Sequence, residues 1–411
     1  MLTEKEKLER LTLLGIELNH IQDLDIMMEK ILTESRLFVN ADAGSIYIRE
    51  RDRLEFTYTQ NDTLQKRLPP GEKLIYSTFS IPIDEKTLAG YVTLTGQPLN
   101  LEDVYRIDPA SPYQFGRRFD EACDYRTKSV LTIPLATPAG KILGILQVIN
   151  ARDEAGRLIA FSDLDMITMM NFAGIASVTL ERAQMTRALL LRMIRMAEMR
   201  DPRETGAHVN RVGGYAVELY ERWARRRCLV EKEIEKNRDL LRMAAMLHDV
   251  GKVGISDTIL KKPGKLDALE YDTMKHHAML GARLFGNSQS EFDDTAAAVA
   301  LNHHEKWDGS GYPGYIDVHT GAALPEHKRT GGLPAGKKGE AIPIFGRIVA
   351  LADVFDALSS IRVYKPAWDE ARVVETLKKD AGTHFDPELV DIFLGSLDIM
   401  RSIQQRYKDD E

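Results

Sequence analysis

The sequence predicts a multidomain protein: an N-terminal α+β domain with an antiparallel sheet flanked by helices, a long connecting helix, and a C-terminal all-α helical bundle. Three observations support this. Short β-like runs occur early in the chain, an unbroken helical stretch follows them, and the apolar spacing is helical almost throughout the rest. A length of 411 residues suits two or three domains of roughly 100–200 residues each. We expect the three parts at residues 1–184, 163–200 and 195–400.

The N-terminal part combines helix and strand signals. Residues 7–39 have apolar side chains at helical spacing and predict one amphipathic helix. Four β-like runs follow it, at residues 44–50, 54–60, 129–137 and 141–150. The last two are joined by a turn that contains Pro138 and Gly140, so we expect them to form the central hairpin of an antiparallel sheet.

The connecting segment, residues 163–200, has no glycine or proline after Gly174 and predicts a single long helix that ends before Pro202. Small and apolar side chains follow a 4-3 spacing along it: Met169, Ala173, Ala176, Leu180, Ala183, Leu190, Ile194 and Ala197. This period favours a parallel coiled coil between two chains. The alternative is one amphipathic helix that packs on its own domain. We expect the coiled coil, and therefore a homodimer.

The C-terminal part predicts a helical bundle. Helical periods occur at residues 206–227, 239–249, 268–286, 293–304, 345–360 and 369–382. A loop rich in glycine and proline, residues 309–343, interrupts them.

Composition excludes several classes of function. The net charge of −7 argues against broad nucleic-acid binding, which needs a basic excess. Only two cysteines occur, Cys123 and Cys228, which suits a reducing cytoplasm rather than a disulfide scaffold. The first residues contain no long apolar run, so we expect neither a signal peptide nor a membrane span.

The distribution of histidine indicates a metal centre in the C-terminal half. Nine of the ten histidines lie after residue 200, and several stand beside apolar helical residues. Because an uncompensated buried charge costs several kcal/mol, many such groups directed inward imply cations that receive them. The candidate ligands are Glu204, His208, His248, Asp249, His277, His303, His304 and Asp353. Imidazole and carboxylate ligands without cysteine suit Fe, Mn, Ni or Zn, and this number suits two or three ions. Two-metal sites are suited to in-line phosphoryl displacement.

These motifs, in this order, resemble the HD-GYP domains, a subgroup of the HD metal-dependent phosphohydrolases. The resemblance extends from about Met196 to Phe393 and includes "MLHDVGK", "HHEKWDGSGYP" and "RIVALADVFDAL". It implies a phosphodiesterase that converts cyclic di-GMP to pGpG and GMP at a di- or trinuclear centre, with iron as the expected metal. All eight candidates match ligand positions of the family, and the glutamate at 204 makes a third ion plausible.

The same resemblance implies further roles. His248, Asp249 and Lys252 would be catalytic, with Lys252 contacting the scissile phosphate. Tyr312 would lie near the substrate, and Arg362 and Lys365 would bind its phosphates. Physical chemistry supports the cations, because a cyclic dinucleotide carries two phosphate charges. Alternatives are a helix C-terminal cation for Lys252, solvated loop charges for Arg362 and Lys365, and a packing role for Tyr312.

Two features depart from the family pattern. The segment after Pro313, residues 314–341, is long, basic and rich in glycine, and could be a mobile lid or a tolerated surface loop. It contains His319 and His327, for which we expect no ligand role. Ile361 stands where aspartate is common in the family.

Residues 20–184 resemble a GAF domain, in stretches such as "GILQVIN". Asn150, Phe161 and Asp165 match part of the signature of cyclic-nucleotide GAF domains, but Ala151 and Met166 break it. The ligand is therefore open, and a domain used only for dimerisation is an alternative. The sequence as a whole predicts a cytoplasmic, dimeric cyclic di-GMP phosphodiesterase under GAF control. The alternatives are a phosphodiesterase for cyclic GMP-AMP and a non-catalytic scaffold that binds cyclic di-GMP.

Overall fold

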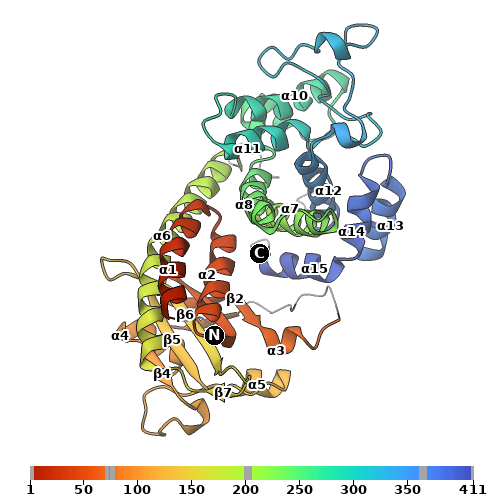
Figure 1. Cartoon of the computed structure of the whole chain (residues 1–411). Helices are drawn as coiled ribbons and strands as arrows, with labels where there is room; N and C mark the ends of the chain where they lie inside the picture. Colours follow the sequence, from red (N-terminus) through yellow and green to blue (C-terminus); the bar gives the residue numbers. More distant parts are fainter. Residues whose placement is uncertain (1–3, 70–73, 75–78, 199–205, 361–367, 409–411) are drawn as a thin grey trace. The chain divides into compact units, whose positions relative to one another are not determined.

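The structure is a computed structural model of the 411-residue chain. It describes residues 4–69, 74, 79–198, 206–360 and 368–408. The chain divides into two compact units, Met1–Arg187 and Ala188–Glu411 (Figure 1). The first unit contains the sheet, and the second is helical.

The first unit contains seven strands and the helices that accompany them. Its strands are β1 (Ala41–Glu50), β2 (Arg53–Asn61), β3 (Phe79–Pro82), β4 (Leu99–Leu101), β5 (Val130–Ala136), β6 (Ile142–Arg152) and β7 (Leu158–Ile159). Its helices are α1 (Glu4–His20), α2 (Leu24–Phe38), α3 (Asp62–Gln65), α4 (Leu88–Thr95), the 3-10 turn η1 (Val104–Arg106), α5 (Arg118–Cys123) and the first part of α6 (Asp163–Glu198).

The sheet is antiparallel, in the order β3-β2-β1-β6-β5-β4, with β7 paired to β6. The predicted hairpin of β5 and β6 is confirmed, and β6 lies at the centre beside β1. Side chains alternate between the two faces of the sheet. Ile46 and Leu146 face a core shared with α1, α2 and α6, whereas Tyr47 and Ile145 face the opposite side.

The N-terminal helix is broken, so the prediction of one helix over residues 7–39 is wrong. Helix α1 ends at His20, and α2 begins at Leu24. Asp23 is the cause, because its side chain accepts hydrogen bonds from the amides of Asp25 and Ile26 as an N-cap. The break lets both helices contribute buried leucines and methionines to one core.

Helix α6 is one continuous helix from Asp163 to Glu198, as predicted. The prediction that its 4-3 seam faces a second chain is wrong for its first five residues. Met169, Ala173, Ala176, Leu180 and Ala183 are at most 2% exposed and lie in the core of their own unit. A regular apolar period shows that a helix face is covered, but it does not show by what.

The second unit is the predicted helical bundle. After the end of α6 it contains α7 (Gly206–Arg226), α8 (Glu231–Met246), η2 (Val250–Gly254), α9 (Asp257–Leu260), α10 (Ala268–Leu284), α11 (Glu291–Asn302), η3 (Pro325–His327), η4 (Gly339–Ala341), α12 (Ile344–Ser359), α13 (Glu370–Asp380), α14 (Pro387–Leu394) and α15 (Leu397–Arg406). Side chains such as Tyr215 on α7, Leu241 on α8 and Phe355 on α12 form its core. Helices α14 and α15 were not among the predicted periods. No helix among the described residues has the length and apolarity that crossing a membrane requires.

Candidate metal centre

Seven of the eight predicted ligands come together in the second unit, contributed by five segments of the bundle. His208 lies on α7, His277 on α10 and Asp353 on α12. His248 and Asp249 follow the end of α8, and His303 and His304 follow the end of α11. The eighth candidate, Glu204, lies outside the described residues, as do Arg362 and Lys365.

The ligand atoms form two groups. The first consists of Asp249, His277, His303 and His304, and the second of His208, His248 and Asp353. Within each group the potential ligand atoms all lie within 4.8 Å of one another. All seven residues are buried or half-buried, as expected for groups that hold cations in a bundle core.

Asp249 lies between the two groups. Its Oδ1 is 3.1 Å from His277 Nε2 and 3.4 Å from His303 Nε2, and its Oδ2 is 3.3 Å from His248 Nε2. Asp353 Oδ1 lies 3.7 Å from His208 Nε2 and 3.9 Å from His248 Nε2. Asp249 therefore presents one oxygen to each group, so its carboxylate could serve both groups if each held an ion.

Hydrogen bonds at Nδ1 orient three of the histidine rings. Three Nδ1 atoms each lie close to the carbonyl oxygen three residues earlier: 2.8 Å for His248, 2.7 Å for His277 and 2.9 Å for His303. Since a carbonyl oxygen only accepts, each Nδ1 must carry the ring proton. Nε2 is then the lone-pair atom, and it is directed into the cluster. Metal-bound histidines have this arrangement.

His208 is oriented by a carboxylate instead. Its Nδ1 is 2.8 Å from Oδ2 of Asp356, which also accepts hydrogen bonds from Arg211. Asp356 is 1% exposed. Neither partner was among the residues predicted from the sequence. Their spacing from the candidate ligands could have indicated them. Asp356 follows Asp353 by three residues and Arg211 follows His208 by three, so each pair shares a helix face.

These residues fit a divalent metal centre. Asp249 Oδ1, His277 Nε2 and His303 Nε2 are buried and have no hydrogen-bond partner among the described residues, although they converge on one another. Buried polar atoms without partners cost about 1–3 kcal/mol each, so this arrangement is expensive unless cations bind there. Burial lowers the pKa of His303, and it lowers that of His304 well below the ordinary value, which keeps both imidazoles neutral.

Burial by itself would raise the pKa of Asp249, but Lys252 and His248 hold it well below the ordinary range. The ammonium nitrogen of Lys252 lies 2.6 Å from Asp249 Oδ2. Lys252 is held in η2, which packs closely on α10. At Gly251 an added Cβ would lie 2.0 Å from the carbonyl oxygen of His277, so this contact requires glycine. The close contact brings Asp249, Lys252 and His277 together.

Tyr312 lies beside the first group of ligands. Its ring centroid is 4.8 Å from that of His304, and burial raises the pKa of its hydroxyl well above the ordinary value. The other four histidines of the second unit lie outside both groups, and one of them, His384, stacks on Phe385 with ring centroids 4.2 Å apart. His276 and His319 are exposed, and His327 stacks on Tyr315 with ring centroids 3.6 Å apart.

The segment 314–341 is not a loose loop, because it is fastened to the loop that carries His303 and His304. Glu305 is 2% exposed, and its two carboxylate oxygens accept hydrogen bonds from the backbone amides of Gly314 and Lys337. The side chain of Lys337 reaches back to Asn302 Oδ1. Arg283 of α10 donates to two carbonyl oxygens of the same segment. Of the two interpretations, a mobile lid and a tolerated surface loop, these contacts argue against the mobile lid.

Comparison with known proteins agrees with this geometry. Residues 23–180 match the GAF domain family, and residues 205–358 match the HD domain family. A 3'3'-cGAMP-specific phosphodiesterase 2 of Vibrio cholerae is 41% identical over 207 residues, which cover 50% of this chain and 34% of the relative. A cyclic di-GMP phosphodiesterase of the same organism is 40% identical over 223 residues, which cover 52% and 40%. The cyclic di-GMP phosphodiesterase response regulator RpfG of Xanthomonas campestris is 40% identical over 208 residues, which cover 51% and 47%.

The chain spans less than half the length of each of these three relatives. The HD match, residues 205–358, contains all seven described residues of the two ligand groups, and the HD family implies a divalent metal centre there. The chain therefore carries a GAF domain followed by an HD domain.

Proposed function

We propose that this protein is a metal-dependent phosphodiesterase that hydrolyses cyclic di-GMP to pGpG and GMP. The observation that carries the proposal is the pair of ligand groups joined by Asp249, with four histidine Nε2 atoms directed into them. The relatives named as cyclic di-GMP phosphodiesterases support the substrate.

The centre would be held by His208, His248, Asp249, His277, His303, His304 and Asp353, with Glu204 as a ligand of a third ion. Iron is the proposed metal, and Mn, Ni or Zn would also suit imidazole and carboxylate ligands. When bound, such a centre supplies Lewis acidity for in-line displacement at phosphorus. The resemblance to HD-GYP domains supports these assignments.

The chain's own side chains would position the substrate. Lys252 lies at the edge of the first ligand group and would place its ammonium against the scissile phosphate. Tyr312 lies beside His304, where its ring would contact the substrate. Arg362 and Lys365 would neutralise the phosphate charges, and this assignment rests on the sequence alone. We expect Arg362→Met and Lys365→Met each to raise KM more than they lower kcat.

The test is anaerobic purification with metal quantification, followed by product analysis with cyclic di-GMP. We expect His248→Ala to lose metal and turnover together, because its Nε2 faces both Asp249 and Asp353. The matched control is His276→Ala, which removes an exposed imidazole outside both ligand groups and should leave both properties unchanged. Full activity in His248→Ala would refute the site. A metal-loaded protein that binds cyclic di-GMP without cleaving it would instead be a scaffold.

A second candidate substrate is a cyclic GMP-AMP dinucleotide. It is favoured by one relative, the 3'3'-cGAMP-specific phosphodiesterase, which is 41% identical over 207 residues. The two substrates are distinguished by the ratio of their kcat/KM values on the same metal-loaded preparation. A ratio above one for cyclic di-GMP supports the main proposal, and a ratio below one supports the alternative.

We also propose a homodimer, through a different face of α6 from the one the sequence indicated. Ile167, Val178 and Met185 are spaced by 11 and 7 residues, so they form one stripe, and each is more than half exposed. We expect Ile167→Lys with Val178→Lys to give a monomer in sedimentation analysis. The control is Val230→Lys, at an exposed valine of the other unit. The two free thiols, Cys123 and Cys228, support a cytoplasmic location.

A further inference from the structure

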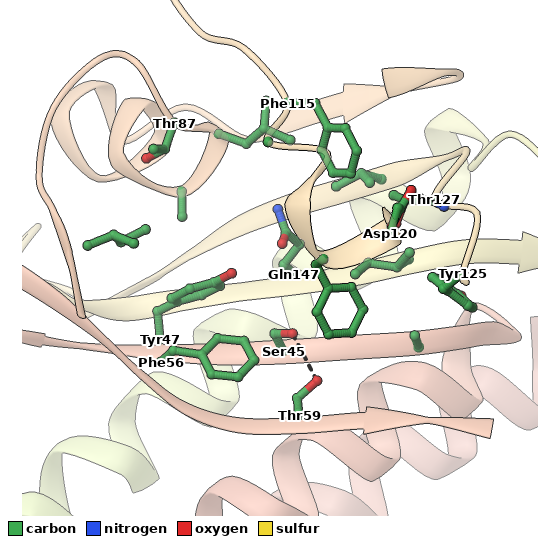
Figure 2. A pocket seen from close by; sticks show the side chains of 18 of the residues that line it. Ser45, Tyr47, Phe56, Thr59, Thr87, Phe115, Asp120, Tyr125, Thr127 and Gln147 are labelled. Carbon is green, nitrogen blue, oxygen red and sulfur yellow. Dashed lines mark hydrogen bonds between the residues drawn. The ribbon is translucent and has the colours of Figure 1, made fainter. Parts of the chain in front are cut away.

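The first unit contains a cavity that the proposed phosphodiesterase activity does not use. It lies on the face of the sheet opposite the core of α1, α2 and α6, and its volume is about 280 Å³. Strands β1, β2, β3, β5 and β6 contribute to its lining, together with residues 87–89, 114–116, 119–120, 125 and 127 (Figure 2). Small-molecule sites have volumes of roughly 300–1,000 Å³, so the cavity suits a compact ligand.

Aromatic rings form much of the wall. Phe56 and Phe79 stack with ring centroids 4.5 Å apart and an angle of 17° between their planes. Tyr47 meets the edge of Phe56 with a centroid distance of 5.3 Å, and Phe115 closes the space from the other side. Flat rings favour a flat aromatic ligand, which can pack against their faces and edges.

Most polar groups of the lining are bonded within the protein. Both oxygens of Asp120 accept hydrogen bonds, from the Tyr105 hydroxyl and from the amide and hydroxyl of Thr127. The hydroxyls of Ser45 and Thr59 lie 3.1 Å apart and bond to each other. These groups maintain the shape of the cavity and contribute little recognition.

On the central strands β1 and β6, two polar groups of the lining have no partner in the described part of the protein. The hydroxyl of Tyr47 has no hydrogen-bond partner among the described residues, although the residue is only 9% exposed. Gln147 donates from its amide nitrogen to Thr132 Oγ1 at 3.0 Å, so its carbonyl oxygen remains available as an acceptor. Both side chains point into the space bounded by Phe56 and Phe115 (Figure 2). A donor and an acceptor that face a cavity without protein partners are available to a ligand that enters it.

The strand register places these two groups side by side. Tyr47 pairs with Ile145, and Ser45 pairs with Gln147, so Tyr47 and Gln147 are diagonal neighbours on one face of the sheet. Diagonal neighbours in an antiparallel pair lie about 7–8 Å apart, which a tyrosine and a glutamine side chain can bridge toward one ligand edge. The site therefore offers one donor and one acceptor to the same edge.

We propose that this cavity binds a neutral, flat heteroaromatic molecule with a lactam-like edge. The ligand's carbonyl oxygen would accept from the Tyr47 hydroxyl, and its ring N–H would donate to the Gln147 carbonyl oxygen. An anionic ligand is disfavoured, because Asp120 brings a negative charge to the lining and the apolar walls desolvate any added charge. Two residues of the partial cyclic-nucleotide signature have structural roles instead. Asn150 donates hydrogen bonds to the Tyr125 hydroxyl and the Arg126 carbonyl oxygen, and Phe161 lies in the core on the helix side of the sheet.

The test uses the full chain and quinolin-2(1H)-one, a neutral bicyclic lactam, in isothermal titration calorimetry. 2-Oxo-1,2-dihydroquinoline-4-carboxylate is the matched anionic probe, because it keeps the lactam edge and adds a negative charge. We expect the lactam to bind at one site per chain and the carboxylate to bind at least tenfold more weakly. Equal or tighter binding of the carboxylate would overturn the proposal, as would failure of the lactam to bind.

Tyr47→Phe removes only the hydroxyl donor. We expect it to weaken lactam binding about tenfold, the effect of losing one hydrogen bond, while thermal unfolding stays close to that of the wild type. The control is Tyr58→Phe, which removes a hydroxyl on the helix side of the sheet, where it contacts Glu29. Unchanged binding in Tyr47→Phe, or equal losses in both variants, would show that the hydroxyl does not recognise the ligand.

Discussion

Replacing Asp356 by asparagine tests whether a carboxylate outside both ligand groups controls the metal centre. Asp356 accepts hydrogen bonds from His208 Nδ1 at 2.8 Å and from Arg211 at 2.7 and 2.9 Å. Burial by itself raises its pKa, but the bonds from His208 and Arg211 outweigh burial and lower it from 3.8 to about 2. This shift corresponds to about 2 kcal/mol of stability, present above pH 3.8 and lost as the pH falls toward 2.

An asparagine at this position offers one acceptor and one donor in place of two acceptors. If the amide oxygen of Asp356→Asn faces Arg211, its N–H faces His208 Nδ1. The ring proton must then move to Nε2, which can no longer bind a cation. If the amide is turned around, its N–H faces the Arg211 guanidinium instead. We expect metal affinity to fall about 10–100-fold and unfolding free energy to fall by about 3–5 kcal/mol.

The assay separates these two effects. Urea unfolding with a chelator reports the loss of the buried ion pair, and metal titration of the folded protein reports the orientation of His208. The control is Asp386→Asn, because Asp386 is a buried carboxylate that pairs with Arg347 at 2.6 Å and belongs to neither ligand group. It should lose stability and keep its metal affinity. Wild-type metal affinity in a folded Asp356→Asn protein would refute the reasoning.

Three further predictions concern the same unit. Lys337→Met should lower kcat several-fold, because it removes a hydrogen bond to Asn302 and loosens the loop that carries His303 and His304. Lys338→Met, at an exposed neighbouring position, should leave kcat unchanged. Steady-state kinetics that match the wild type for both variants would contradict this prediction. Gly251→Ala should lower the unfolding free energy by about 1–3 kcal/mol or more and abolish metal binding, because the added Cβ would clash with the carbonyl oxygen of His277. An unchanged urea midpoint would argue against this close contact. Burial lowers the pKa values of His303 and His304, so at low pH the unfolded chain takes up protons that the folded chain does not. The unfolding free energy of chelator-treated protein should therefore fall as the pH is lowered from 7.5 to 5.5. A urea midpoint that does not change over this pH range would contradict the prediction.

The candidate ligands could be proposed from the sequence because their chemistry is local. Imidazole and carboxylate groups beside apolar helical residues stand out in a linear pattern, and seven of the eight candidates lie in two compact groups. Strand alternation and turn residues likewise located the β5–β6 hairpin. The sequence did not reveal which groups orient each ligand. The carbonyl oxygens behind His248 and His277 carry no sequence signal, since every residue has one.

The sequence by itself determined the two kinds of domain and the residue types of the metal centre, because periodicity and side-chain chemistry are properties of short segments. Only the tertiary structure decided what those segments face. It placed Asp249 between the two ligand groups and buried the seam of α6 in its own domain. It also left the Tyr47 hydroxyl and the Gln147 carbonyl in one cavity. The physical reason is that a contact depends on the position of both partners, and residues far apart in the chain meet only after folding.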